Sequence, residues 1–162
     1  MDAVRLVDLL KNRGLTLAVA ESLTGGLLVA EFIAVPGASA VVNGGVVAYN
    51  TALKHSLLGV DSELLAERGA VDPDVAAAMA EGVRLACAVD GVPSSIGIST
   101  TGVAGPDPQD GKPVGTVYVG VASETGTRVI ALTFGGSRNA IRAGVVSECL
   151  VQLKIVLTDS AD

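Results

Sequence analysis

The stretch Ala20-Glu21-Ser22-Leu23-Thr24-Gly25-Gly26 decides the fold of this chain, because it separates two apolar runs. Residues 15–19 precede it and residues 27–35 follow it, so we expect a sharp turn from a buried strand into a helix. Hydroxyls and bare backbone N–H groups would gather there at the positive end of the helix dipole, which suits an anion or a developing oxyanion. The plainer alternative is that Thr24 only caps the helix.

The pattern on either side of this turn alternates helices and strands. Helices are expected over residues 4–10, 25–35, 51–58, 73–89 and 138–157, with another from Asp61 to Gly69, and strands over residues 16–20, 41–49, 95–100, 115–123 and 127–134. Asn43-Gly44-Gly45 is either a turn or a bulge, and Asp72-Pro73-Asp74 signals a helix start. No linker or repeat is visible, so residues 1–162 are expected to form one three-layer α/β/α sandwich with a mixed central sheet.

Composition excludes several classes of protein. The net charge is −6 with few aromatic residues and no basic cluster, which disfavours nucleic-acid binding. Charged residues interrupt the long apolar segments, and Met1 to Arg5 do not resemble a secretory signal, so we expect a cytoplasmic protein without a membrane partner. Cys87 and Cys149 are expected to be buried thiols, and two cysteines with one distant histidine do not form a zinc site.

Tyr49, Asn50 and Lys54 form a second group of interest, on a short helical segment. A lone lysine there is usually a solvated surface charge. In a poorly solvated pocket, however, a lysine has a depressed pKa and can take a proton from a hydroxyl, as in Ser–Lys nucleophile pairs. His55 is the only histidine, and we expect it to face solvent rather than act as a base.

Two further Gly-rich turns follow strands. The loop from Thr100 to Pro106 lies at a strand end, where ligands bind in open α/β sheets, and its extension to Pro113 is long enough for a partial lid. Its spacing matches neither a P-loop nor a dinucleotide fingerprint. The second turn precedes a helix that carries Arg138 and Arg142 on one face, with Ser137 as a plausible cap. Arginine opposes the helix dipole there, which suggests that an anion such as phosphate compensates.

Taken in order, these segments resemble the CinA C-terminal domain family. The shared motifs are the Ala20–Gly26 turn, the Tyr49–Lys54 segment, Gly102–Pro106 followed by Lys112–Val117, and the Gly136–Arg142 turn. Each motif is weak alone, but the ordered set is specific and covers nearly the whole chain. Larger family members carry a further N-terminal domain, and this chain resembles the stand-alone form.

The resemblance implies an amidohydrolase that converts nicotinamide mononucleotide to nicotinate mononucleotide and ammonia. It also implies an α/β/α fold, no organic cofactor, no metal, and a homodimer or higher homo-oligomer. Ser22 would attack, or position the attacking water, with Lys54 as its general base. Thr24 and the N–H groups of Gly25 and Gly26 would steady the oxyanion. Substrate contacts are expected from Glu21, Gly25, Gly26, Tyr49, Thr101, Gly102, Gly105, Arg138 and Arg142.

Three departures from the commonest family pattern stand out. Leu23 replaces a frequent Cys, Thr101 replaces a Ser and keeps a hydroxyl, and Ser137 replaces an Asp that would orient Arg138. The last change bears on substrate affinity more than on fold. The sequence leaves open whether Ser22 or Thr24 attacks and whether a covalent intermediate forms. It also leaves open two other functions: a non-catalytic nucleotide-binding or regulatory module, as the competence and DNA-damage associations of the family suggest, or a different nucleotide or phosphate-ester hydrolase that uses the same pocket.

Overall fold

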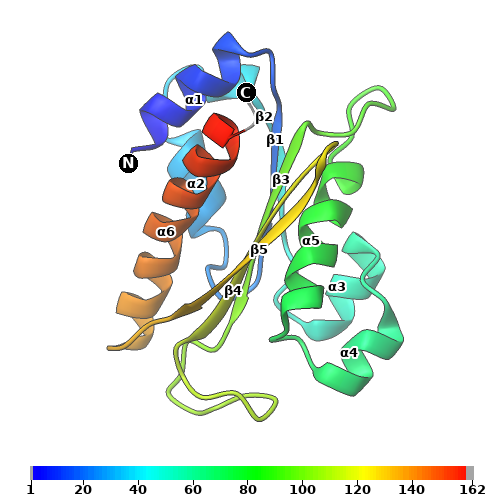
Figure 1. Ribbon diagram of the computed structural model, residues 1–162, viewed down its shortest axis with the longest axis vertical. Helices are drawn as coiled ribbons and strands as arrows, with labels where there is room; N and C mark the ends of the chain where they lie inside the picture. The colour runs from blue at the N-terminus through cyan, green and yellow to red at the C-terminus, as the bar shows by residue number, and fades with distance from the viewer. Residues whose placement is uncertain (1, 160–162) are drawn as a thin grey trace.

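A five-stranded mixed sheet organises the molecule, as the computed structural model of residues 2–159 shows (Figure 1). The strands are β1 (Leu17–Glu21), β2 (Val42–Val47), β3 (Ile96–Gly102), β4 (Thr116–Ser123) and β5 (Gly126–Thr133), in the order β2-β1-β3-β4-β5. β1 pairs in parallel with β2 and β3, whereas β4 is antiparallel to both of its neighbours. The expected α/β class with a mixed sheet is therefore confirmed.

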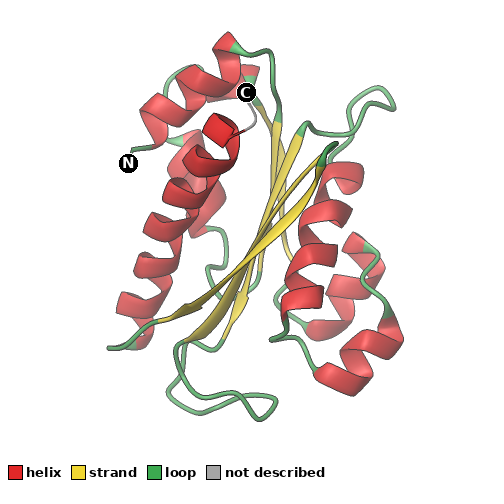
Figure 2. Ribbon diagram, in the orientation of Figure 1, coloured by secondary structure: helices red, strands yellow, loops and turns green. Residues whose placement is uncertain are grey.

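Helices cover both faces of this sheet (Figure 2). One face carries α1 (Ala3–Asn12), α2 (Leu27–Ile33) and α6 (Arg138–Asp159), and the other carries α3 (Thr51–Leu58), α4 (Ser62–Arg68) and α5 (Pro73–Ala86). Successive side chains of β1 point to opposite faces of the sheet and so contribute to both hydrophobic cores. Leu17 and Val19 belong to the core under α1, α2 and α6, and Ala18 and Ala20 belong to the core under α3 to α5. A short 3₁₀ turn, Ala38–Ala40, precedes β2.

The Asn43-Gly44-Gly45 segment is a bulge within β2 and not a turn. Leu17 pairs with Val42, but the next residue, Ala18, already pairs with Gly44, so Asn43 is the extra residue. The Asn43 side chain donates to the hydroxyl of Ser94 at 2.9 Å, which gives the irregular strand a partner outside the ladder.

Helix α5 lies unusually close to the middle of the sheet. Asp72 caps it by accepting from the Asp74 N–H, and Pro73 occupies the first turn, as expected from the sequence. A Cβ on Gly97 would lie 2.0 Å from the Ala80 carbonyl oxygen, so only glycine fits between this helix and β3. The close approach fixes the position of β3 and hence of the residues that follow it.

Several element boundaries differ from the sequence expectations. Helix α2 begins only at Leu27, because Gly26 at φ 100° lies in the left-handed region. Helix α5 ends at Ala86 and not at Val89, since residues 89–92 form a tight turn. Of the two cysteines, Cys149 is buried as expected, whereas Cys87 is half-buried; burial raises the pKa of both thiols. No helix within residues 2–159 combines the length and apolar character that crossing a bilayer requires.

Candidate active site

Ser22 lies immediately beyond the carboxyl end of β1. Its N–H donates to the Thr100 carbonyl at 3.0 Å, which extends the β1–β3 pairing by one residue and fixes the direction of the turn. The side chain lines a cavity of about 440 Å³ and is 8% exposed. The turn therefore presents the Ser22 hydroxyl to a cavity beyond the carboxyl ends of the parallel strands.

Lys54, on α3, contacts this hydroxyl. Asn50 caps α3 by accepting from the Ala52 N–H, and the buried face of this short helix consists of Lys54 and Leu58. The Lys54 Nζ donates to Ser22 Oγ at 3.0 Å and to the Ala48 carbonyl at 2.7 Å, and the side chain is fully buried. The surface position that an isolated lysine usually takes is therefore not observed.

Burial lowers the pKa of Lys54 from 10.5 to about 8, and the negative charge of Asp110 opposes this shift by raising it. A substantial fraction of the amine is consequently neutral slightly above neutral pH, when its lone pair is free to accept a proton. His55 on the same helix is exposed, and its Nδ1 lies 2.7 Å from the Val60 carbonyl oxygen, so it faces solvent as expected.

Thr24 is buried, and within residues 2–159 its hydroxyl is not a hydrogen-bond partner of the Lys54 amine. Its hydroxyl forms a hydrogen bond of 2.8 Å with the Thr100 hydroxyl, which also accepts from the Ser22 N–H at 3.3 Å. Thr24 does not line the cavity. Of the two hydroxyls that the sequence left as alternatives, the one beside the lysine and the cavity is Ser22.

Glu21 occupies the helix terminus that the sequence suggested for a ligand. Its carboxylate, 1% exposed, accepts from the N–H groups of Gly26 at 3.1 Å, Leu28 at 3.0 Å and Val29 at 2.9 Å. The N–H of Gly25 donates to the Ser22 carbonyl. The N–H groups of both glycines are thus engaged within the chain, because the buried carboxylate takes the charge-stabilising position at the start of α2.

Two other backbone donors lie at the same turn. Within residues 2–159, neither the Leu23 N–H nor the Thr24 N–H has a hydrogen-bond partner, and Leu23 lines the cavity directly after Ser22. An N–H on the residue after a nucleophile is a common oxyanion donor at strand-to-helix turns. Sequence reasoning missed this donor, although the position after a candidate nucleophile is itself a usable signal.

Arg138 closes one side of the cavity. Its guanidinium donates to the Gly105 carbonyl at 2.6 Å and to the Tyr49 hydroxyl at 2.9 Å, so it joins the loop after β3 to the segment before α3. Ser137 accepts from the Ala140 N–H at 3.2 Å and caps α6 as expected. Arg138 is exposed, which leaves guanidinium surface available to a ligand.

Arg142 and Thr101 support the site from behind. Arg142 donates to the carbonyls of Leu23 at 2.8 Å and Thr24 at 3.2 Å, and so holds the turn. The Thr101 hydroxyl is fully buried and donates to the Ala70 carbonyl at 2.6 Å. Neither residue lines the cavity. Both residues were expected to contact substrate. In the structure their polar groups donate to backbone carbonyls, so they support the segments around the cavity and do not line it.

The cavity brings together only part of the site expected from the sequence. Of the expected residues, those that line it are Ser22, Tyr49, Gly102, Gly105 and Arg138, joined by Leu23, Asn50, Thr51, Val103, Ala104, Asp107 and Gln109. Lys54 lies behind Ser22 and reaches the cavity through it. In the part of the chain that the structure describes, no group of three His, Cys, Asp or Glu side chains is arranged to hold a metal ion.

Comparison with protein families and curated proteins gives a consistent result. A family model described as the CinA C-terminal domain matches residues 2–157. A "Putative competence-damage inducible protein" of Geobacillus sp. (strain WCH70) is 51% identical over 139 residues, covering 85% of this chain and 32% of that protein. A "CinA-like protein" of Frankia casuarinae is 49% identical over 145 residues, covering 90% of this chain and 32% of that protein. The chain thus spans about a third of these relatives.

Solved structures match nearly end to end. The competence/damage inducible protein CihA from Agrobacterium tumefaciens superimposes with a TM-score of 0.88 at 33% identity, covering 96% of this chain and 93% of that chain. A competence-damaged protein (CinA) superfamily protein from Klebsiella pneumoniae superimposes with a TM-score of 0.90 at 30% identity, covering 97% and 96%. The sheet and its six helices are therefore shared with proteins of similar length.

Proposed function

The chain belongs to the CinA C-terminal domain family, and from that premise we propose that it hydrolyses the carboxamide of nicotinamide mononucleotide to give nicotinate mononucleotide and ammonia. One observation carries the proposal: a fully buried lysine amine, Lys54 Nζ, lies 3.0 Å from the hydroxyl of Ser22, which lines a cavity. Cleaving an amide without a metal requires an activated nucleophile, and this pair supplies the nucleophile and its base.

The first half of the reaction forms an ester. Neutral Lys54 accepts the Ser22 proton while Ser22 Oγ bonds to the carboxamide carbon. The Lys54 ammonium then returns that proton to the amide nitrogen, and the C–N bond breaks. Ammonia leaves, and the acyl group stays bound to Ser22 Oγ as an ester. The lowered pKa of Lys54, about 8, suits both directions of transfer near neutral pH.

The second half releases the acid. Neutral Lys54 accepts a proton from a water whose oxygen bonds to the ester carbon, and the proton passes to Ser22 Oγ as the ester C–O bond breaks. Both tetrahedral intermediates carry an oxyanion, for which we propose the Leu23 N–H as donor, because it follows Ser22 directly and lies at the cavity. One such donor contributes about 10²–10³ in rate.

The nucleotide part of the substrate fits the opposite wall. A cavity of about 440 Å³ lies within the range of pockets for small ligands. The Arg138 guanidinium presents several donors suited to a phosphate, and it is already oriented by Gly105 and Tyr49. We therefore place the phosphate at Arg138 and the carboxamide at Ser22, with Tyr49 near the ring or ribose.

The alternative is a non-catalytic nucleotide-binding or regulatory module. The observation that favours it is the naming of relatives such as that of Geobacillus sp. and of the Agrobacterium tumefaciens structure after competence and damage, and not after a reaction. In such a module the same cavity would bind a nucleotide, but Ser22 and Lys54 would serve only folding.

Ammonia release from nicotinamide mononucleotide separates the two. Wild-type protein, Ser22→Ala and the matched control Ser56→Ala, which alters an exposed serine on α3, are assayed together. We expect Ser22→Ala to lose on the order of 10³-fold in kcat while Ser56→Ala retains wild-type turnover. The binding module would be established instead by two results together: wild-type protein releases ammonia no faster than Ser22→Ala, and calorimetry shows that wild-type protein still binds the nucleotide.

A further inference from the structure

Two Asp-Gly turns in this protein have nearly the same backbone. Asp90 and Asp110 have φ values of 52° and 51°, and the glycine after each also has positive φ. Each pair is bracketed by residues that exchange two backbone hydrogen bonds, Val89 with Val92 and Gln109 with Lys112. Two-residue turns of this form favour Asp-Gly or Asn-Gly, so local conformation explains an Asp or an Asn equally well at both positions.

Of the two aspartates, only Asp110 has a side chain that bonds to a residue outside its own turn. Its carboxylate accepts from the Ala70 N–H at 3.0 Å, across 40 residues of sequence. It fits against Gly69, where a Cβ would lie 2.5 Å from the carboxyl carbon. Within residues 2–159 the Asp90 side chain makes no hydrogen bond or ion pair. The two turns also lie at opposite ends of the sheet, after α5 and between β3 and β4 (Figure 1).

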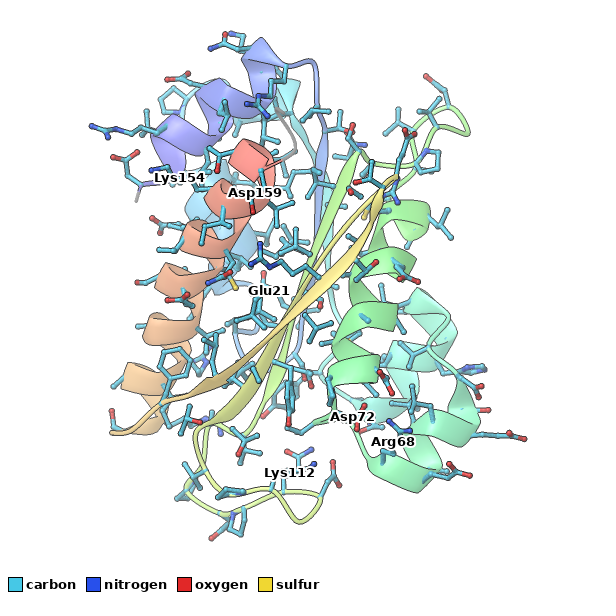
Figure 3. All side chains as sticks on the ribbon, in the orientation of Figure 1. Glu21, Arg68, Asp72, Lys112, Lys154 and Asp159 are labelled. Carbon is cyan, nitrogen blue, oxygen red and sulfur yellow. The ribbon has the colours of Figure 1, made fainter. Side chains whose placement is uncertain are left out.

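Ala70 connects this contact to the site. Its carbonyl accepts from Thr101, and the neighbouring Thr100 holds both the Ser22 N–H and the Thr24 hydroxyl. The loop after β3 provides one wall of the cavity through Val103, Ala104, Gly105, Asp107 and Gln109. At Asp110 it bonds to Ala70, two residues before Asp72, which Figure 3 labels near Arg68. Asp110 therefore fastens this cavity wall to the segment between α4 and α5.

The charge of Asp110 also acts on Lys54. Helix α3 packs against α4 and α5. At the adjoining ends of α4 and α5, Arg68 pairs with Asp72 at 3.8 Å and with Asp74, so both of these carboxylates are bonded to a cation. His55 on α3 is exposed. The other charged side chains of α4 and α5 are exposed or bonded elsewhere: Glu63, Glu67, Glu81 and Arg84. Asp110 is the charge that alters the pKa of Lys54, which it raises against the effect of burial.

We propose that Asp110 is a positioning residue: its carboxylate, which accepts from the Ala70 N–H and fits against Gly69, fastens the loop that walls the cavity to the segment between α4 and α5. The charge of the same carboxylate has a second effect, on Lys54, and this effect rests on the proposed function because it matters for turnover only if Lys54 is the base. Asp110 then sets how much neutral base is present at a given pH, while the fastened loop keeps the cavity wall in place.

Three substitutions separate these effects. Asp110→Asn keeps the turn and an acceptor for the Ala70 N–H but removes the charge. Asp110→Gly keeps the left-handed backbone and removes both charge and acceptor. Asp90→Asn makes the same chemical change in the matching turn at the far end of the sheet and is the control.

The titration of Lys54 tests the charge effect without turnover. The chain has four lysines, so selective isotope labelling gives four side-chain signals, and Lys54→Met identifies the one from Lys54. We expect the proton affinity of Lys54 to fall on the order of threefold in both Asp110 variants, less at high salt, and to stay unchanged in Asp90→Asn. The acid limb of the kcat/KM profile should move to lower pH by about half a pH unit, which corresponds to the same threefold change in proton affinity. An unchanged Lys54 titration in Asp110→Asn overturns this effect.

Amide exchange at Ala70 tests the fastening. We expect about tenfold faster exchange in Asp110→Gly and wild-type protection in Asp110→Asn and Asp90→Asn. Equal protection in Asp110→Gly overturns the fastening. Both readouts are independent of chemistry, so a wild-type protein that releases no ammonia overturns the proposed function, while titration and exchange still decide what Asp110 does.

Discussion

The Lys54 Nζ lies 3.0 Å from Ser22 Oγ, although the two residues are 32 positions apart, Ser22 in the turn between β1 and α2 and Lys54 on α3. Both contacts that Lys54 makes, to Ser22 and to the Ala48 carbonyl, are buried. A charged amine in this place loses most of its hydration, and the lowered pKa expresses that cost. The same burial that weakens folding is what makes the amine available as a base near neutral pH.

Replacing Lys54 should therefore abolish turnover and change how stability depends on pH. Below pH 8 the amine is charged in both the folded and unfolded states, and only the folded state bears its desolvation. Between pH 8 and 10.5 the unfolded wild-type protein binds more protons than the folded one, so wild-type stability rises with pH. A pKa lowered from 10.5 to about 8 corresponds to roughly 3 kcal/mol.

We accordingly expect the stability of Lys54→Met, relative to wild type, to fall by about 3 kcal/mol from pH 8 to pH 10.5 in chemical unfolding. Lys11→Met removes an exposed lysine from α1 and is the control, with a difference that does not change over this interval. A pH-independent difference for Lys54→Met would contradict the shifted amine.

Turnover itself should rise with pH. The base accepts a proton only when neutral, so kcat/KM should increase about tenfold per pH unit well below the Lys54 pKa of about 8 and level off above it. The measurement is ammonia release between pH 7 and 9.5, where the substrate phosphate, with a second pKa of about 6, is almost entirely in its dianionic form. A profile that is flat or falls across this range would exclude a neutral amine as the base.

Arg138 should contribute to nucleotide binding more than to bond cleavage. Because its guanidinium lies at the cavity wall and Ser22 elsewhere in the same cavity, Arg138→Ala should raise KM on the order of 10-fold to 100-fold with kcat changed only severalfold. Arg128→Ala, which removes an exposed arginine paired with Asp159 on the far side, is the control. An unaltered KM for Arg138→Ala would place the phosphate elsewhere.

Glu21 should matter for the fold at the start of α2. Glu21→Gln keeps one acceptor oxygen but turns an amide group toward N–H donors and removes the negative charge from the helix terminus. We expect a loss of about 2–4 kcal/mol in the free energy of unfolding. Glu31→Gln, on the exposed face of the same helix, should change it by less than about 0.5 kcal/mol. Equal stability of the two variants would show that the carboxylate is dispensable.

Much of the fold follows from local sequence. Apolar runs bounded by glycine and proline locate all five strands, and the Asp-Pro-Asp sequence at residues 72–74 marks the start of α5 as observed. The helix over residues 51–58 was predicted with its observed bounds. Boundaries fail where backbone conformation decides: Gly26 delays α2, and the turn at Asp90 shortens α5.

The candidate site was predicted as a set of residues but not as an arrangement. Ser22, Tyr49 and Arg138 line the cavity with Lys54 behind Ser22, as their motifs suggested. The sequence could not rank Ser22 against Thr24, because both hydroxyls occupy one turn and only the path of α3 determines which of them the amine meets. Nor could it assign Arg142, whose long side chain reaches either a ligand or the turn carbonyls from the same backbone position.

The sequence alone determined the layered α/β architecture and the residues from which a site can be made, since hydrophobic periodicity and turn chemistry act over a few neighbouring positions. Tertiary structure decided how those residues are used. Glu21 satisfies the helix terminus that looked open to a ligand, and Lys54 is buried where a lone lysine is usually solvated. These outcomes depend on which groups compete for the same donors and on how much water remains, and both are fixed only when the strands and helices pack together.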